Sequence, residues 1–333
     1  MPDFQTEKQL IQDYHIALEV ASSGDVAAVE EKFAHQGYQW RGFHPFNEIS
    51  SPSEVGRQFW EPLKTSVSSL QRREDIFFAG ENWLNKDGSV WVVSMGHLMG
   101  LFDKDWIGIP ATQKMVMLRY SSFYRVANGK IAETLMYFDL PHFMVQAGKR
   151  VFPKQTAQHF VQPGPAGHHG LLLEPQPEDE GLRTRAAIDA MVSDLGQWNL
   201  GIPLEEELAR TWHDDMLWWG PEGIGATYTI ERYAKQHSGV FRAAFSDRSK
   251  TKHIARVAEG EFGAFAGWPN FTATLSGPFM GVEPTGKKAE FRVIDVYRRR
   301  GDKLHENWIF IDMLHFWKSQ GFDVLADGLP VKT

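Results

Sequence analysis

Apolar positions near the start of the chain recur every three or four residues, as they do along one face of a helix. This spacing runs through residues 5–34 and is broken near Gly24 and Asp25. It predicts two helices, the second capped by Asp25. Residues 184–212 repeat the theme more loosely, with a break at Gly201 and Pro203.

Two later stretches, residues 89–139 and 262–312, are instead typical of strands. Long runs rich in β-branched and aromatic residues alternate with turn residues, among them Asn128-Gly129 and Gly301-Asp302. Such pairs indicate hairpins. The runs 131–138 and 304–311 are apolar on both faces, so both faces of these strands need cover.

The two halves of the chain share one pattern. Residues 123–148 align without gaps with residues 296–321, at an offset of 173 (296 − 123), and Trp40 corresponds to Trp218 at an offset of 178 (218 − 40). A fixed offset of this kind indicates a duplicated unit. We therefore predict domains at residues 1–150 and 184–333. The Pro, Gly and His-rich connector 151–183 is expected to contribute little to either core.

Composition narrows the class of protein. With 42% hydrophobic and 23% charged residues, 333 residues suffice for two ordinary globular domains. The chain has no cysteine, which excludes disulfides, thiolate nucleophiles and zinc–thiolate sites. A net charge of −7 argues against nucleic acid as a partner. No stretch reads as a signal peptide or membrane span, so we expect a cytoplasmic protein without a membrane partner.

Each copy resembles the cone-shaped NTF2-like (cystatin-like) fold, and more narrowly the SnoaL-like polyketide cyclase family. The resemblance covers residues 5–150 and 184–325. It implies an α+β fold of two tandem domains, each with N-terminal helices packed on a curved, mainly antiparallel sheet. The motif residues that carry it are Gly129-Lys130-Ile131, Glu133, Asp139 and Gly148 in the first copy, and Thr285-Gly286-Lys287, Glu306, Trp308, Asp312 and Gln320-Gly321 in the second.

The resemblance also implies an activity. In SnoaL-like cyclases an aspartate at the end of the last long strand acts as acid/base, which implies Asp312 and Asp139 here. Those enzymes also use a histidine near the end of the preceding strand, where this chain has Tyr297 or Tyr124, each followed by an arginine. We expect a cofactor-free acid/base enzyme of cyclase, isomerase or hydrolase type, acting on a small, largely apolar carbonyl or ring compound. The alternative is a non-catalytic tandem ligand-binding or scaffold protein.

Both aspartates allow a structural interpretation as well. Each lies where a strand gives way to a short helix, so it could simply cap that helix, with His315 or His142 on the first turn. A buried carboxylate at the mouth of a cone would instead be a usable base near neutral pH. The Asp-x-x-His spacing would suit a metal, but no third ligand accompanies it, so neither metal nor cofactor is expected.

The remaining candidates would line the pockets. Regular alternation places Trp308 and Phe310 on the face of Asp312. Asp295, shifted in parity, lies on the strand of Arg292, and Ser122 replaces it in the first copy. Core packing or ion pairing is the alternative role for each candidate. The predicted catalytic residues are Asp312, Asp139, Tyr297 and Arg292; the predicted ligand-binding residues are Trp308, Phe310, Trp218, His315, Tyr137, Trp40, Arg119, Tyr124, His97 and His142.

The partner expected from this interpretation is a small apolar molecule. Because the last strands need cover on both faces, the two copies are also expected to form an internal pseudo-dimer. The sequence leaves open whether the molecule forms a homo-oligomer, which of the two cones is open, and what substrate it holds.

Overall fold

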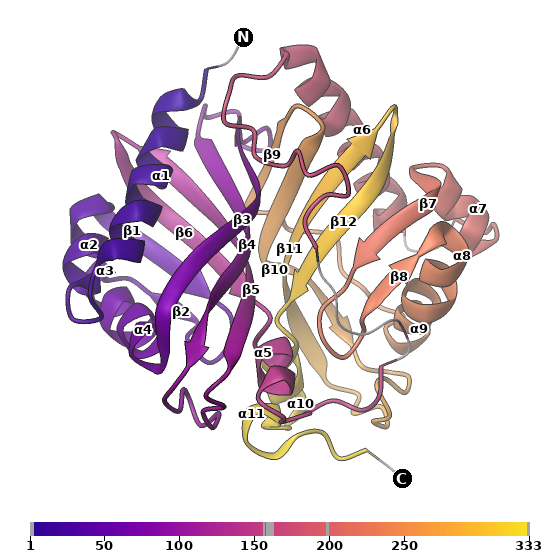
Figure 1. The fold of residues 1–333 in the computed structure, drawn as a ribbon. Coiled ribbons are helices and arrows are strands. Elements are labelled where there is room, and N and C mark those ends of the chain that lie inside the picture. The colour runs from indigo at the N-terminus through magenta and orange to yellow at the C-terminus, as the bar shows by residue number, and fades with distance from the viewer. Residues whose placement is uncertain (1–2, 156, 158–162, 198–199, 332–333) are drawn as a thin grey trace. The chain divides into compact units, whose positions relative to one another are not determined.

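The computed structural model describes residues 3–155, 157, 163–197 and 200–331 (Figure 1). The chain divides into two compact units. The first, here called the first domain, contains residues 1–149 and 166–175, and the second domain contains residues 150–165 and 176–333. No helix in the described ranges is both long and apolar enough to cross a membrane.

The first domain begins with helices and continues into a six-stranded sheet of order β2-β1-β6-β5-β4-β3. Strands β1 and β6 are parallel, and the other neighbours are antiparallel. Its elements are α1 (Gln5–Val20), α2 (Val26–Phe33), β1 (Ala34–Gly42), β2 (Glu48–Ile49), α3 (Pro52–Val55), the π-helical turn η1 (Gly56–Trp60), α4 (Glu61–Ser66), β3 (Val67–Glu81), β4 (Val90–Phe102), β5 (Met115–Ala127), β6 (Lys130–Phe138) and α5 (Leu140–Gln146).

The second domain repeats this architecture with sheet order β8-β7-β12-β11-β10-β9, in which β7 and β12 are the parallel pair. Its elements are α6 (Glu178–Gln197), α7 (Leu204–Ala209), β7 (Trp212–Trp219), β8 (Ala226–Tyr228), α8 (Thr229–Tyr233), the π-helical turn η2 (Ala234–Ser238), α9 (Gly239–Ala244), β9 (Ala255–Glu259), β10 (Phe262–Thr274), β11 (Lys288–Arg300), β12 (Lys303–Ile311), α10 (Met313–Gln320) and α11 (Val324–Asp327).

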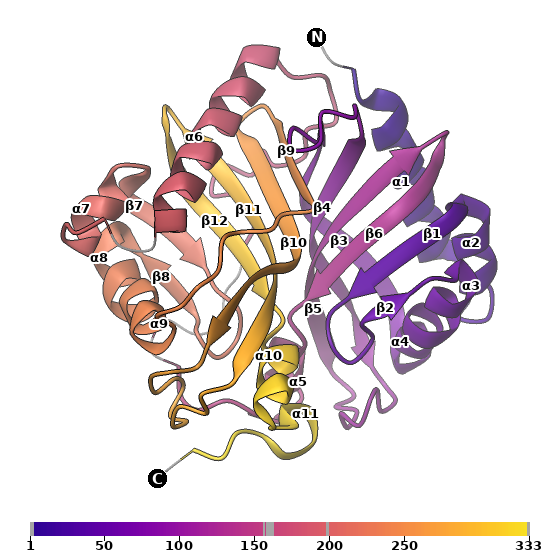
Figure 2. The same cartoon turned by 180° about the vertical axis from the view of Figure 1, so that it is seen from behind.

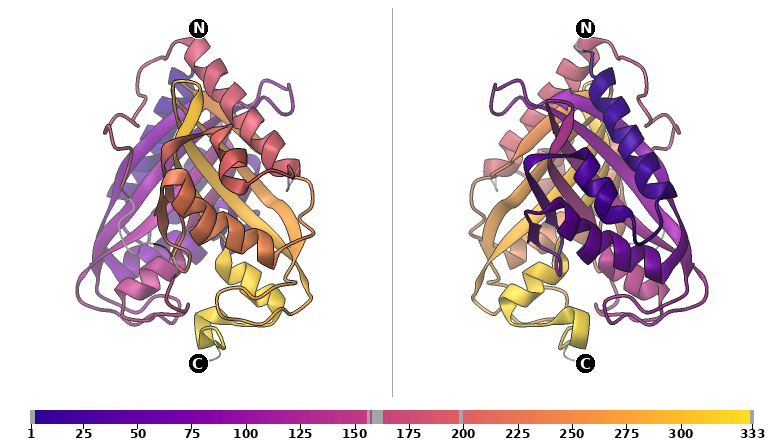
Figure 3. Two further views of the ribbon diagram at one scale, coloured as in Figure 1. Left: turned by 90° about the vertical axis from the view of Figure 1, so that its right-hand side faces the viewer. Right: turned by 90° about the vertical axis from the view of Figure 1, so that its left-hand side faces the viewer.

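Within each domain the helices that precede the long strands lie across one face of the sheet, as Figures 2 and 3 show for α1–α4 and for α6–α9. The predicted fold, two tandem α+β domains with a mainly antiparallel sheet, is confirmed. The sequence signals act locally as expected. Asn128 and Gly129, both at positive φ (51° and 68°), form the tight turn between β5 and β6, and Gly321 ends α10 in the left-handed conformation.

The connector behaves differently from the prediction. Helix α6 begins at Glu178, inside the segment assigned to the connector. Val151 and Phe152 are buried. Gly170 and Leu172 exchange backbone hydrogen bonds with Phe77 of β3. The expectation that residues 151–183 contribute little to either core is therefore wrong at these positions, because their backbone and apolar side chains find partners within the domains.

Candidate active site

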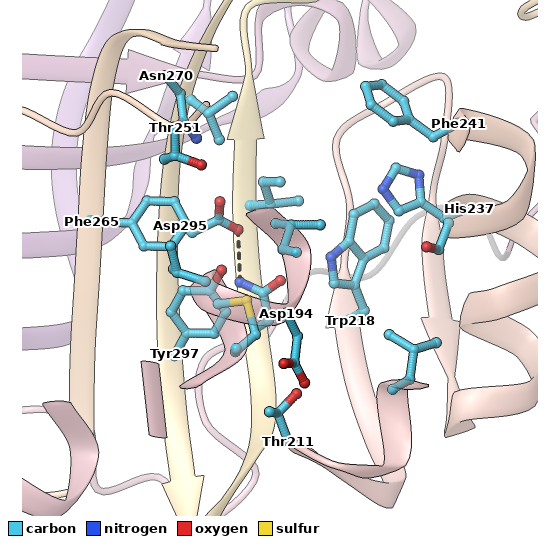
Figure 4. Close-up of a pocket in the computed structure, with 18 of the residues that line it drawn as sticks. Asp194, Thr211, Trp218, His237, Phe241, Thr251, Phe265, Asn270, Asp295 and Tyr297 are labelled. Carbon is cyan, nitrogen blue, oxygen red and sulfur yellow. Dashed lines mark hydrogen bonds between the residues drawn. The ribbon is translucent and has the colours of Figure 1, made fainter. Parts of the chain in front are cut away.

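The second domain contains a partly open cavity of about 110 Å³ between its helices and one face of its sheet (Figure 4). Side chains from α6, α7, η2 and α9 form one wall, and side chains from β7, β10, β11 and β12 form the other. Much of the lining is aromatic, including Trp218, Phe241, Phe265 and Phe271. A cavity of about this volume with apolar walls accommodates roughly one small ring compound.

The alternation of strands β11 and β12 determines which residues reach the cavity. Val293, Asp295 and Tyr297 of β11 lie directly opposite Ile311, Ile309 and Asn307 of β12 in the antiparallel register. All six line the cavity. Since every second residue of a strand points to the same face, these three cross-strand pairs form a continuous patch on the cavity side of the sheet.

Asp295 is the acidic group at the centre of this patch. Its side chain is 5% exposed, and its Oδ1 accepts a hydrogen bond of 3.0 Å from the Asn307 amide, which also donates to the carbonyl of Val296. Burial raises the pKa of Asp295 to about 7, against the opposing effects of the Asn307 and Tyr297 donors and of the Arg248 charge. A carboxyl of this kind exchanges a proton near neutral pH.

Across the cavity from Asp295 stand Trp218 and His237 (Figure 4). Their rings stack with centroids 4.1 Å apart and planes 20° apart. His237 belongs to the π-helical turn η2, an irregularity that often marks functional positions in helices. Burial lowers the pKa of His237 to about 3, so its imidazole is neutral at physiological pH.

Three other charged side chains of the lining, Arg242, Glu207 and Asp194, are already paired. Arg242 binds Glu207 through both guanidinium nitrogens, at 2.5 and 3.0 Å. Asp194 pairs with Arg210 at 3.2 Å. In each of these pairs the carboxylate is neutralised by an arginine. Asp295 differs from Glu207 and Asp194 because its hydrogen bonds come from neutral groups.

The sequence model of the SnoaL-like polyketide cyclases matches the chain twice, at residues 14–147 and 196–318. The chain belongs to the SnoaL-like polyketide cyclase family. Each of its two domains is one SnoaL-like unit, in agreement with the duplicated sheets. A search of curated proteins found no match.

Solved structures similar to the chain each span about one domain. AclR from Streptomyces galilaeus is 23% identical, with 42% of this chain and 97% of AclR covered and a TM-score of 0.35. IdmH from Streptomyces antibioticus is 20% identical, with coverages of 42% and 99% and a TM-score of 0.34. An NTF2-like protein from Burkholderia thailandensis is 19% identical, with coverages of 43% and 96% and a TM-score of 0.32.

In both SnoaL-like domains the predicted catalytic aspartate caps the helix that follows the last strand. Asp312 accepts a hydrogen bond of 3.1 Å from the backbone of His315, and its second oxygen lies 3.3 Å from Arg292. Asp139 accepts from the backbone of His142 at 3.1 Å, with Arg119 at 3.9 Å. Neither aspartate is among the residues that line the cavity. Their catalytic roles remain predictions.

Of the other candidates in the second SnoaL-like domain, Tyr297 and Trp218 line the cavity, whereas Trp308 and Phe310 do not. Trp308 instead donates from its indole nitrogen to the carbonyl of Pro163 at 2.8 Å. The face of β12 that carries Trp308, Phe310 and Asp312 was expected to line the pocket, but the opposite face of β12 lines this cavity. The alternation itself holds, because Trp308, Phe310 and Asp312 all lie outside the cavity, whereas Asn307, Ile309 and Ile311 line it. Asp312 does not mark the cavity face because it caps α10 and pairs with Arg292.

The predicted site residues of the first SnoaL-like domain each contact a different neighbour. Tyr137 stacks on Phe43, and Trp40 packs against Phe59. His97 lies 3.2 Å from Asp75. The remaining contacts are a hydrogen bond of 3.0 Å between the Tyr124 hydroxyl and His15 and one of 3.3 Å between His142 and Gln146.

A group of polar side chains lies buried in the interior of the first SnoaL-like domain. The Arg72 guanidinium lies over the Tyr120 ring at 4.7 Å. Glu74 accepts from Ser94 at 2.7 Å and lies 2.9 Å from His15. A cavity of only about 20 Å³ adjoins His15 and Arg72. At this place the described residues leave far less room than the cavity of the second domain does.

Sequence reasoning did not select Asp295, Asn307 or His237 as site residues. The sequence did contain a signal for Asp295. It is the single acidic residue within the apolar run 293–297 of β11, and the matching position of the first copy is Ser122, which is not acidic. Its parity is the one that faces the cavity. No comparable signal marked His237, because the helical turn that carries it has no regular apolar period.

Proposed function

We propose that the second SnoaL-like domain is a cofactor-free acid/base catalyst that acts on a small, largely apolar carbonyl or ring compound, with Asp295 as general base. The observation that carries this proposal is the position of Asp295. Its carboxyl is buried in the wall of an aromatic-lined cavity and is held there by the amide of Asn307.

The surroundings suit removal of a proton from carbon. A carboxylate in an apolar wall is a stronger base than one in water, because burial disfavours its charge. Asn307 fixes the orientation of the carboxylate, so less conformational freedom is lost when the substrate reacts. The aromatic walls exclude water from the reacting atoms.

A second group must stabilise the oxygen on which negative charge develops. Burial, followed by the neighbouring Asp295 charge, raises the pKa of Tyr297 well above its usual value, so this phenol remains protonated. It lines the cavity beside Asp295, to whose carboxyl it donates, and its single O–H turns to the substrate oxygen as Asp295 takes up the proton. Tyr297 thus keeps the role predicted from sequence, while the proposed base moves from Asp312 to Asp295.

The proposal can be tested before the natural substrate is known. Small ring ketones such as 1-indanone exchange the hydrogens next to the carbonyl for deuterium in D₂O when a base removes them, and proton NMR follows this exchange. We expect the protein to accelerate exchange above the buffer rate. Asp295→Asn should lower the acceleration by about 10²–10⁴, the usual scale for a lost general base.

The chain provides a matched control. Glu30 is also buried, and burial raises its pKa to about 7, but it lies in the first domain, bonded to Tyr14 at 2.5 Å. Glu30→Gln should therefore leave exchange unchanged. Loss of exchange in Asp312→Asn but not in Asp295→Asn would assign the base to Asp312. Ketone binding without any exchange would favour the non-catalytic ligand-binding alternative.

A further inference from the structure

One end of the cavity carries a group of polar side chains that the proposed base chemistry does not use. Arg248, Thr251 and His253 come from residues 245–254, between α9 and β9, and Asn270 comes from β10. All four line the cavity, and Figure 4 shows Thr251 and Asn270 on the same side of it as Asp295. We call these four residues the polar corner.

The backbone holds the polar corner in place. Residues 249, 252 and 254 donate backbone hydrogen bonds of 2.6–2.8 Å to carbonyls of β10, so the segment runs along the strand rather than free of it. On β10, the register shifts between Gly267 and Phe271, where a bulge contains Asn270. Because bulges redirect side chains, this one accounts for an amide that points into the cavity.

Arg248 gives the polar corner a positive charge. Its guanidinium lies 4.3 Å from the centre of the Phe271 ring, and one nitrogen donates to the Thr251 hydroxyl at 3.2 Å. Burial lowers the pKa of Arg248 to about 10, so the group is still cationic at neutral pH. A cation in an apolar wall attracts an anion more strongly than one in water does.

His253 and Asn270 complete the polar corner. The His253 ring stacks on Phe265 at 3.9 Å, and its Nδ1 accepts from Arg256 at 2.7 Å, so its Nε2 carries the hydrogen. This Nε2 and the Oδ1 of Asn270 are both buried, and the two side chains interact with each other without forming a hydrogen bond of good geometry. Because buried polar atoms gain from a better partner, their place in the cavity wall suits a polar group of a ligand.

We propose that the substrate carries an anionic oxygen group, such as a carboxylate or an ionised phenol, which binds in the polar corner while its ring lies among the aromatic walls. Arg248 and the Nε2–H of His253 donate to the anion. The Asn270 amide turns to present its NH₂, which releases its oxygen from the His253 side chain and frees the Nε2–H for the anion. This inference rests on the proposed function, since it places the ring beside Asp295.

The test compares two probes of nearly the same shape, benzoate and benzamide, by NMR titration of the full chain at pH 6, where Asp295 is mostly protonated. We expect benzoate to bind more tightly by about tenfold, the scale of a charge-assisted hydrogen bond. Arg248→Gln should abolish this preference. Arg183→Gln, which removes an exposed arginine of the same domain, should leave it intact.

Arg248→Lys and Asn270→Asp keep the test informative if Arg248→Gln does not fold. The lysine retains the charge and should retain much of the preference, whereas the added carboxylate of Asn270→Asp should weaken benzoate binding and spare benzamide. Equal binding of both probes by the unmodified protein, or a preference that survives Arg248→Gln, would overturn the inference. Ketone exchange that depends on Asp295, without any benzoate preference, would leave the proposed function standing alone.

Discussion

Inside the second domain, the amide of Asn307 donates a hydrogen bond of 3.0 Å to the carboxyl of Asp295. The corresponding positions of the first domain, at the offset of 173 residues, are Ser122 and Thr134 (295 − 173 and 307 − 173). There, Thr134 accepts from Tyr38 at 3.1 Å. The duplication has thus kept the strands while placing a carboxyl–amide pair in one copy alone.

The first prediction concerns Asn307. Its hydrogen bond lowers the pKa of Asp295. Asn307→Leu should therefore shift the rise of ketone exchange with pH upward, by on the order of one pH unit. A pH–rate profile measures the shift. An unchanged midpoint would mean that the Asn307 hydrogen bond does not lower the pKa of Asp295.

The second prediction concerns stability against pH. Burial raises the pKa of Asp295 from 3.8 to about 7. The folded state therefore holds a proton that the unfolded state has lost between about pH 4 and 7. The contribution of Asp295 to the free energy of unfolding therefore falls as the pH rises from about 4 to about 7. Asp295→Asn removes this dependence. The free energy of unfolding of the variant should therefore rise relative to that of the unmodified protein between pH 4 and 8, by on the order of 2–4 kcal/mol at most. Urea unfolding at several pH values measures this difference. Parallel plots of unfolding free energy against pH for the two proteins would contradict the prediction.

The third prediction separates capping from catalysis at Asp312. Its carboxyl accepts the backbone hydrogen bond of His315. Asn caps a helix nearly as well as Asp, whereas Ala does not, so Asp312→Ala should be less stable than Asp312→Asn by about 1 kcal/mol. Thermal unfolding of the two variants gives the difference. Equal stability would show that the cap contributes nothing measurable.

The fourth prediction concerns the buried polar group of the first domain. Arg72 lies over the rings of Trp60 and Tyr120. Burial opposes ionisation of Glu74, yet the charges of His15 and Arg72 lower the pKa of Glu74 to about 2. Burial lowers the pKa of His15 to about 4, so at neutral pH Arg72 is the cation beside this carboxylate. Arg72→Met should therefore destabilise the protein by about 3–5 kcal/mol at neutral pH. The change should leave ketone exchange by the folded protein intact. Loss of exchange at temperatures where the variant is folded would argue for a catalytic role of the first domain.

Much of the fold could be predicted because its signals are local. The Asn128-Gly129 turn, the break before α2 and the constant offset between copies each depend on a few adjacent residues. Strand β3 was missed because its first half, from Val67 to Glu74, is largely polar in sequence. Segments 52–66 and 229–244 were missed because their helices are short and interrupted by π-helical turns, which disturb the apolar period.

The site was harder to predict because burial depends on the whole domain. Asp312 and Asp295 are both acidic residues near the end of an apolar run. Only the structure shows that Asp312 caps a helix and pairs with Arg292, while Asp295 faces a cavity. The room around a given side chain depends equally on residues distant in sequence, as where Arg72 lies over the Tyr120 ring.

The most direct measurement of the central claim is the pKa of the Asp295 carboxyl itself, from carbon-13 NMR of protein with labelled aspartate, assigned by comparison with Asp295→Asn. The account predicts a pKa of about 7, caused by burial. A value near 4, the usual range of a solvated aspartate, would contradict it.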